Sequence, residues 1–189
     1  MILGLDISTS CTGYSIISQN GDLVDQGYIR LNQAEDHFSR VQDIKKCISE
    51  KHRCYSFTHI FIEQNLQSFR SGFSSARTLS TLARFNGMVS LASFNATGLR
   101  PEYINVNNAR KSVGLKIISK KKGGKPTKEQ VVEWVTEKIS DTKYKWPVKI
   151  LKSGPRKGQM VLDPGCYDIA DAYVIAEAGR LILSSYENS

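Results

Sequence analysis

The sequence predicts an α/β fold, with a mixed five-stranded sheet flanked by helices. Short apolar segments at 2–7, 13–18 and 23–30 open the chain, and an Asn-Gly-Asp turn at 20–22 joins the last two as a hairpin. Segments with helical periodicity then alternate with short apolar strands. The resulting order, β-β-β-α-β-α-β-α and one last helix, is typical of a sheet with antiparallel strands at one edge and parallel strands beyond them.

The first helix is expected over residues 34–51, where apolar side chains recur every three or four positions. The residues expected on its buried side are Phe38, Val41, Ile44 and Ile48. Residues 59–63 (HIFIE) follow as a short strand of the buried type that ends in an acid. This strand is expected to pair in parallel with the first strand of the sheet.

A second helix is expected from 74 to about 96 and a fifth strand at 102–106. The residues that can share the buried side of this helix are Leu79, Leu82, Ala83, Met88 and Leu91. A third helix is expected at 127–139, because Thr127 and Gln130 have the spacing of a capping box. The last helix should cover about 168–184.

The charge of the chain is unevenly distributed. Its 189 residues suit one domain over 1–189, and the net charge is +8. Residues 100–189 hold 17 basic and 10 acidic side chains, whereas residues 1–99 hold 9 basic and 8 acidic ones. Basic insertions near 116–128 and 141–165 contain Gly and Pro and are expected to be loops or irregular hairpins. This asymmetry indicates a polyanionic partner such as nucleic acid; a merely soluble basic surface is the alternative.

Several other classes of protein are disfavoured by the sequence. No apolar segment has the length of a membrane span, and Asp6 interrupts the apolar N-terminus, which argues against a signal peptide. The cytoplasm is therefore the expected location. The side chains of Cys47, His52, Cys54 and His59 are close in sequence, but their spacing fits no common zinc site, and reduced thiols are the preferred interpretation.

Four acids occupy positions where strands end or a helix begins. Asp6 ends the first strand, Glu63 ends the fourth, and Asp168 and Asp171 lie on one face of the first turn of the last helix. If the first and fourth strands pair in parallel and that helix crosses them, the four carboxylates converge. Like charges so close together repel, and a divalent cation relieves the repulsion. Carboxylate oxygens suit Mg²⁺ or Mn²⁺. Two such ions bound close together are the usual catalysts of phosphodiester hydrolysis.

Each of these acids also has a purely structural interpretation. Asp6 could cap the Ser-Thr-Ser turn at 8–10, and Glu63 could keep an edge strand soluble. Asp168 and Asp171 could be acids favoured at a helix N-terminus. The joint pattern favours a site, because Asp6 and Glu63 both follow apolar strand residues, where unpartnered acids are rare.

Four segments of the chain together resemble the RuvC family of Holliday-junction resolvases, within the ribonuclease H-like superfamily. They are ILGLDISTSCTGYSII, IFIEQNLQSF, NVNNARKSVG with the later TKEQVVEWV, and YDIADAYVIA. Their order and spacing agree with the family over nearly the whole chain. The resemblance implies a ribonuclease H-like fold and a metal-dependent endonuclease that acts as a homodimer on four-way DNA junctions, in DNA recombination and repair.

The resemblance also implies roles for individual residues. The metal acids would be Asp6, Glu63, Asp168 and Asp171, holding two Mg²⁺ ions per active site, for which Mn²⁺ is expected to substitute. Lys111 and Lys128 match lysines near the scissile phosphate, with Lys128 counted among the catalytic residues. The remaining candidates for DNA binding are Arg110, Phe69, Phe73, Arg70, Lys120, Lys121 and Lys122. For Phe69 and Phe73, stacking at the junction centre and a role in the core are alternatives.

Some features depart from the bacterial pattern and indicate a phage, viral or otherwise divergent member. The lysine-rich loop at 116–128 is longer, and the insertion at 141–165 has no counterpart that we can align. Such basic additions could extend the substrates to other branched DNA. Two competing functions are a sugar- or acetate-kinase-like ATPase, whose phosphate-binding hairpin resembles DISTSCTG, and a DNA-binding module that has lost catalysis. The chain is short for such a kinase, and it retains all four acids.

Overall fold

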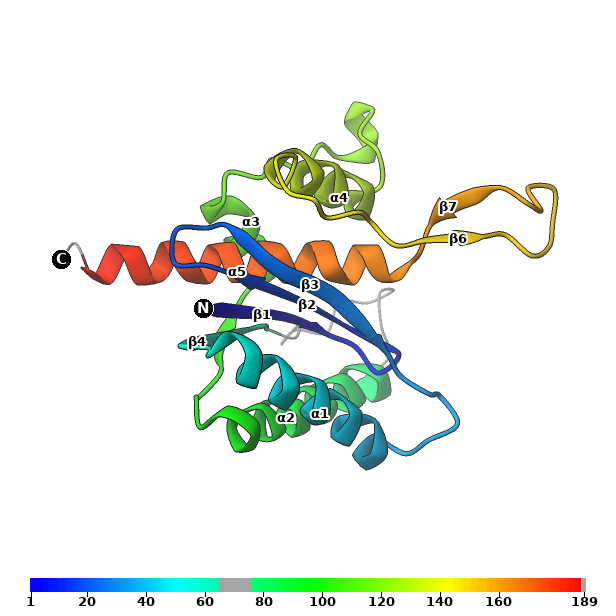
Figure 1. Ribbon diagram of the computed structural model, residues 1–189. Coiled ribbons are helices and arrows are strands. Elements are labelled where there is room, and N and C mark those ends of the chain that lie inside the picture. Colours follow the sequence, from blue (N-terminus) through cyan, green and yellow to red (C-terminus); the bar gives the residue numbers. More distant parts are fainter. Residues whose placement is uncertain (65–75, 188–189) are drawn as a thin grey trace.

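A computed structural model describes residues 1–64 and 76–187, and in them the predicted mixed sheet is confirmed (Figure 1). The strands lie in the order β3-β2-β1-β4-β5, with β1 antiparallel to β2, β2 antiparallel to β3, and β1, β4 and β5 parallel. Their bounds are β1 Ile2–Ile7, β2 Cys11–Ile17, β3 Leu23–Arg30, β4 His59–Glu63 and β5 Glu102–Ile104. The turn after β2 is the predicted one, with Gly21 at a φ of 94°.

Helices cover both faces of this sheet (Figure 1). Helices α1 (His37–Tyr55) and α2 (Ala76–Thr97) lie on one face, and α5 (Gly165–Glu187) crosses the other. Helix α4 (Thr127–Lys138) packs on the outer side of α5. Each face of the sheet has its own apolar core, which includes Ile44, Ile60 and Phe85 on the α1–α2 side and Phe61, Val135 and Ile175 on the α5 side.

The buried faces of α1 and α2 differ in part from those predicted. Val41, Ile44 and Ile48 are buried as expected, but Phe38, in the first turn of α1, is exposed. In α2 the prediction placed Leu91 inside, whereas it is 61% exposed. The residues of α2 that are buried are Phe85, Asn86, Val89, Ala92 and Ser93. Polar and small side chains lie among the large apolar ones on this face, and they interrupt the apolar pattern from which its phase was predicted.

The predicted capping box of α4 is wrong. Pro126 is the N-cap residue and Thr127 is already helical. The Gln130 side chain instead accepts a hydrogen bond from the backbone N–H of Ile118 and donates to the carbonyls of Ile118 and Lys125. It therefore fixes the lysine-rich loop to α4 rather than capping the helix.

The structure adds elements in and beside the basic insertions. A short helix α3 (Val106–Ser112) follows β5, and the turn η1 (Lys120–Lys122) lies in the first insertion. The second insertion contains a hairpin of β6 (Val148–Ile150) and β7 (Met160–Leu162) that projects from the body of the molecule (Figure 1). Across 1–64 and 76–187, no helix is long and apolar enough to cross a membrane.

Candidate active site

The sheet brings Asp6 and Glu63 to the same edge. In the parallel pair of β1 and β4, Leu5 lies opposite Ile62, so Asp6 and Glu63 follow side by side where both strands end. Glu63 is further held by Asn86 of α2, whose buried side-chain amide donates to the Glu63 backbone carbonyl at 3.2 Å. Asn86 was not among the predicted site residues; its only signal in the sequence was a polar residue among the apolar positions of α2.

Helix α5 brings the second pair of acids to this edge because two glycines let its backbone lie directly on the sheet. A Cβ on Gly13 of β2 would overlap the carbonyl group of Asp168, and a Cβ on Gly4 of β1 would overlap the carbonyl oxygen of Ala172. The first turns of α5 therefore rest on the two strands beside Asp6. Asp171, one helical turn after Asp168, is buried there.

The acids perturb one another electrostatically. Burial raises the pKa of Asp6 well above its usual range, and the charges of Glu63, Asp171 and Asp168 raise it further. Burial, followed by the charge of Asp171, raises the pKa of Glu63 to about 7, although Arg110 and a hydrogen bond with Asp6 act in the opposite direction. Both carboxyl groups therefore resist ionisation more than ordinary carboxyl groups do, as expected for acids that are buried close together.

Asp168 belongs to the same cluster. Burial is the largest cause that raises its pKa, while a hydrogen bond with Cys11 and the charge of Lys128 lower it. Cys11, at the start of β2, was not among the predicted site residues, and its own thiol pKa is raised mainly by burial. Its position at the same sheet edge as Asp6 was the only signal in the sequence.

Arg110 is the cation that reaches the acids directly. Its Nη2 atom donates to Oδ1 of Asp171 at 2.9 Å, and both side chains are largely buried. Within the described part of the chain its Nε atom is buried without a hydrogen-bond partner. Arg110 lies on α3, which begins where the Asn105 side chain accepts the backbone N–H groups of Asn107 and Asn108. The sequence analysis placed Arg110 among the DNA-binding residues only; the structure also pairs it with an acid.

The donor set suits a hard divalent cation. It consists of carboxylates whose pKa values are raised first by burial and then by the charges of the neighbouring acids, and such oxygens are the preferred ligands of Mg²⁺ and Mn²⁺. As the side chains stand, no three His, Cys, Asp or Glu residues in 1–64 and 76–187 are grouped closely enough to enclose an ion. The carboxylates can turn toward one ion by rotation about two bonds, while β1, β4 and α5 fix their backbones. The residues present therefore fit the predicted ions.

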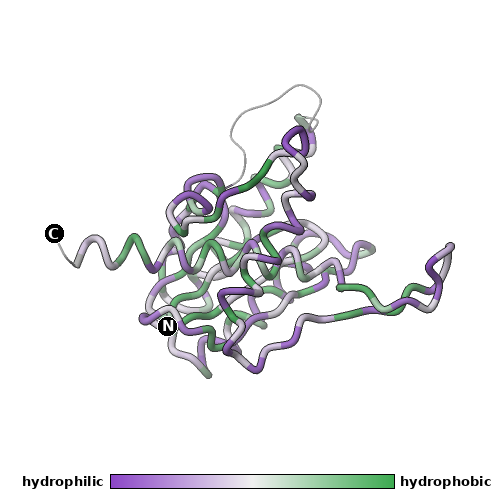
Figure 2. Tube along the Cα trace, turned by 90° about the horizontal axis from the view of Figure 1, so that it is seen from above, coloured by the Kyte–Doolittle hydropathy of each residue, from purple (hydrophilic) through white to green (hydrophobic). Residues whose placement is uncertain are grey.

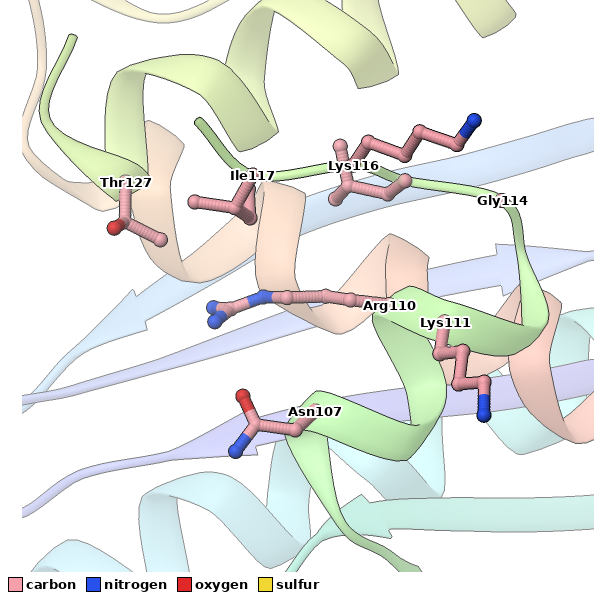
Figure 3. A pocket seen from close by; sticks show the side chains of 8 residues that line it. Asn107, Arg110, Lys111, Gly114, Lys116, Ile117 and Thr127 are labelled. Atoms are coloured by element: carbon pink, nitrogen blue, oxygen red, sulfur yellow. The ribbon is translucent and has the colours of Figure 1, made fainter. Parts of the chain in front are cut away.

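A pocket of about 420 Å³ lies beside α3, and Arg110, which pairs with Asp171, is one of its lining residues (Figure 3). Its lining includes Arg110 and Lys111 of α3, Lys116 and Thr127. Figure 3 shows Arg110 and Lys111 pointing in different directions from α3, so the two side chains have different environments. Arg110 reaches Asp171, and Lys111 is exposed.

Lys128 lies near the acids from the side of α4. Its charge lowers the pKa of Asp6, Glu63 and Asp168, and its Nζ atom lies 5.8 Å from the centre of the Tyr167 ring. Lys120, Lys121 and Lys122 form the exposed turn η1. The predicted DNA contacts Phe69, Arg70 and Phe73 lie outside the described residues.

Comparisons with known proteins agree with this geometry. The family model of "Crossover junction endodeoxyribonuclease RuvC" matches residues 2–146, a range that includes Asp6 and Glu63 but ends before the β6–β7 hairpin and α5. A search of curated proteins found no match.

Similar solved structures include T. thermophilus RuvC in complex with Holliday junction substrate, with a TM-score of 0.64 and 16% identity over 97% of this chain and 94% of that chain. A second structure of Thermus thermophilus RuvC has a TM-score of 0.60 and 18% identity, over 98% of this chain and 96% of that chain. The yeast mitochondrial Holliday junction resolvase Ydc2 has a TM-score of 0.57 and 16% identity, over 99% of this chain and 80% of that chain. At these identities the likeness concerns the fold, and it confirms the predicted ribonuclease H-like architecture.

Proposed function

The chain belongs to the RuvC family of crossover junction endodeoxyribonucleases, and from this premise we propose that it resolves four-way (Holliday) junctions by metal-dependent hydrolysis of phosphodiester bonds. The observation that carries the proposal is the electrostatic coupling of Asp6, Glu63, Asp168 and Asp171 at one sheet edge. Other branched DNA is included in the proposal, because the basic insertions offer phosphate contacts beyond the core of the fold.

The four acids would hold two Mg²⁺ ions, which when bound lower the pKa of a water molecule and stabilise charge on the leaving 3′ oxygen. The role of the chain itself is to position the acids and to neutralise negative charge beside them. Gly4 and Gly13 let α5 set the second acid pair against the first. The exposed amine of Lys128, whose charge acts on three of the acids, is suited to hold a phosphate beside them.

The wider basic surface would hold the DNA backbone. Residues 103–160 carry 15 basic and 4 acidic side chains. Arg110, Lys111 and Lys116 line one pocket beside the acids, and the turn η1 extends the positive surface. Such contacts are insensitive to base sequence, so we expect selectivity to come from the shape of the junction, and binding to weaken steeply with salt.

A homodimer would match the two-fold symmetry of a four-way junction and give two active sites. The outer face of α2 supports this proposal. Leu91 and Phe94 are 61% and 40% exposed on it, and one turn earlier Gly87 meets no other described atom within 4 Å of an added Cβ. A glycine inside an exposed helix is unfavourable for the isolated helix but permits close approach of a second helix. We propose that this face packs against the same face of a second copy.

Nicking of a synthetic four-way junction tests the proposed activity. Asp171→Asn should leave junction binding intact and lower the nicking rate with Mg²⁺ by roughly 10²–10⁴-fold, the range expected when a positioned catalytic group is lost. The matched control is Glu177→Gln on the same helix, because Glu177 pairs with Arg180 instead of the acids. Cleavage by Asp171→Asn at the wild-type rate would refute the metal site, and binding without any cleavage by the wild type would indicate a lapsed nuclease.

A further inference from the structure

The β6–β7 hairpin is a feature that the family match does not cover. It spans residues 148–162, and β6 and β7 pair antiparallel, with Val148 opposite Leu162 and Ile150 opposite Met160. The hairpin extends well beyond the sheet and its helices, as Figures 1 and 2 both show. With at most ~3.3–3.6 Å per extended residue, its tip can reach about 25 Å from its base.

The base of the hairpin is fixed beside the candidate active site. The backbone N–H of Asp163 donates to the carbonyl of Pro147 at 2.9 Å, which closes the hairpin. The Asp163 carboxylate accepts hydrogen bonds from Arg30 of β3 at 2.8 Å and from the backbone N–H of Gly165 at 2.9 Å. Helix α5 starts at Gly165 and carries Asp168 in its first turn. The hairpin is therefore held at the end of the molecule where the acids lie.

One face of the hairpin is apolar and uncovered. Strand pairing places four large apolar side chains on the same face, and Figure 2 shows the apolar stretches along the projecting segment. Their exposed fractions are 53% for Val148, 61% for Ile150, 68% for Met160 and 39% for Leu162. The opposite face includes Lys149 and Val161, which line a groove of about 580 Å³ against α4 together with Leu162, the least exposed of the four. An exposed apolar face on an extended element indicates a contact surface.

The charge of the hairpin indicates the chemistry of its partner. Lys149, Lys152, Arg156 and Lys157 give it four positive charges, and no acid occurs between Asp141 and Asp163. Lys152, Arg156 and Lys157 are exposed in the tip, where Gly154 and Gly158 adopt φ values of 79° and 86°. A second copy of this chain, with a net charge of +8, is a poor electrostatic match, whereas a polyanion is a good one.

We propose that the β6–β7 hairpin is a DNA-contacting arm that recognises the branch point. The cations of the tip hold backbone phosphates, and the apolar face packs against bases that the branch leaves unstacked. A two-stranded ribbon is narrow enough for the major groove, which is ~12 Å wide, and apolar side chains are known to act as wedges between base steps. This inference rests on the proposed function and deepens it, since it assigns the recognition of branched DNA to a defined segment.

The apolar face is tested by Ile150→Ser with Met160→Ser, two exposed positions whose replacement leaves the core intact. Binding is measured in EDTA by fluorescence anisotropy, on a four-way junction and on a linear duplex of the same arm sequence. We expect at least a tenfold weaker affinity for the junction and an unchanged affinity for the duplex. A 2-aminopurine at the branch point should brighten with the wild type and not with the variant. Phe38→Ser with Tyr186→Ser, both at exposed aromatics away from the hairpin, is the control.

The cations of the tip are tested by Lys152→Gln with Arg156→Gln. Each phosphate contact contributes about 0.9 to the slope of log affinity against log salt concentration, so this pair should reduce the slope by nearly 2. Lys46→Gln with Arg53→Gln removes one lysine and one arginine from the exposed side of α1 and should leave the slope unchanged. Thermal denaturation establishes that all variants are folded.

The outcomes separate this inference from the proposed function. If the wild type nicks junctions while both hairpin variants bind and brighten the probe as it does, the arm is refuted and the nuclease stands. If the wild type shows no preference for the junction over the duplex, the arm and the proposed function are both refuted. If the Ile150→Ser, Met160→Ser variant instead changes a dimer into a monomer in sedimentation, the apolar face is an interface between copies and the arm is also refuted.

Discussion

At the scale of single residues, the site is organised around negative charge that the fold concentrates and only partly compensates. Arg110 pairs with Asp171, and Lys128 acts on three other acids from an exposed position. Asp6 and Glu63 remain with raised pKa values, chiefly because they are buried. This arrangement costs stability, which is the expected property of a site that is built for a ligand and not for the fold.

The pKa of Glu63 leads to a prediction for stability against pH without metal. Between the ordinary value of 4.5 and the raised value of about 7, the folded chain keeps a proton that the unfolded chain has released. The contribution of Glu63 to stability should therefore be present below this window and be lost as the pH rises through it. In urea titrations in EDTA, the wild type should lose roughly 2–3 kcal/mol relative to Glu63→Gln between pH 4 and pH 8.

The same titrations with Mg²⁺ provide the control. In the proposed function the ion supplies the missing counter-charge, so its addition should reduce the difference between wild type and Glu63→Gln at pH 8. Parallel pH curves for the two proteins in EDTA would show that the burial of Glu63 does not perturb its titration.

At the scale of elements, contact between α5 and the sheet decides the geometry of the site. Gly13 on β2 and Gly4 on β1 leave room for the helix backbone where any side chain would overlap it. Because the register of α5 on the strands is set by these contacts, Asp168 and Asp171 are positioned by glycines that carry no chemistry of their own. Conformational precision at the site thus depends on the absence of two side chains.

Gly13→Ala should accordingly push the first turn of α5 away from β2. We expect a loss of about 2–3 kcal/mol in the free energy of unfolding, as for overpacked cores, together with a lower nicking rate. Ser15→Ala on the same strand is the control, because the buried Ser15 hydroxyl has no hydrogen-bond partner in the described structure and its removal adds no volume. A Gly13→Ala protein with the stability and activity of the wild type would contradict the role of this contact.

The sequence predicted the elements well where a simple period governs burial. The strand order and the α5 acids followed from apolar runs that end in Asp6 and Glu63 and from the spacing of Asp168 and Asp171. The buried side of α2 did not follow in this way, because Asn86 and Ser93 lie among its apolar residues and interrupt their period. The pairing of Arg110 with Asp171, across 61 residues, is a tertiary contact that no local pattern encodes.

At the scale of the whole molecule, the wrongly assigned Leu91 becomes informative. Leu91→Glu would place an unpaired charge in the proposed interface between α2 helices, and we expect the dimer to weaken at least ~100-fold. Sedimentation velocity measures this change, and the monomer should still bind junctions while losing paired cuts on opposite strands. Tyr186→Glu, at an exposed aromatic residue of α5 on the other face of the sheet, is the control. An unchanged oligomeric state in Leu91→Glu would exclude this interface.

The two ends of the β6–β7 hairpin meet at the bond between Asp163 and Pro147, so the segment enters and leaves the fold at nearly one point. An insertion attached in this way can lengthen, shorten or be exchanged while the sheet and α5 keep their places. Substrate choice could therefore diverge among relatives, or be redesigned by grafting, without any change to the chemistry of cleavage.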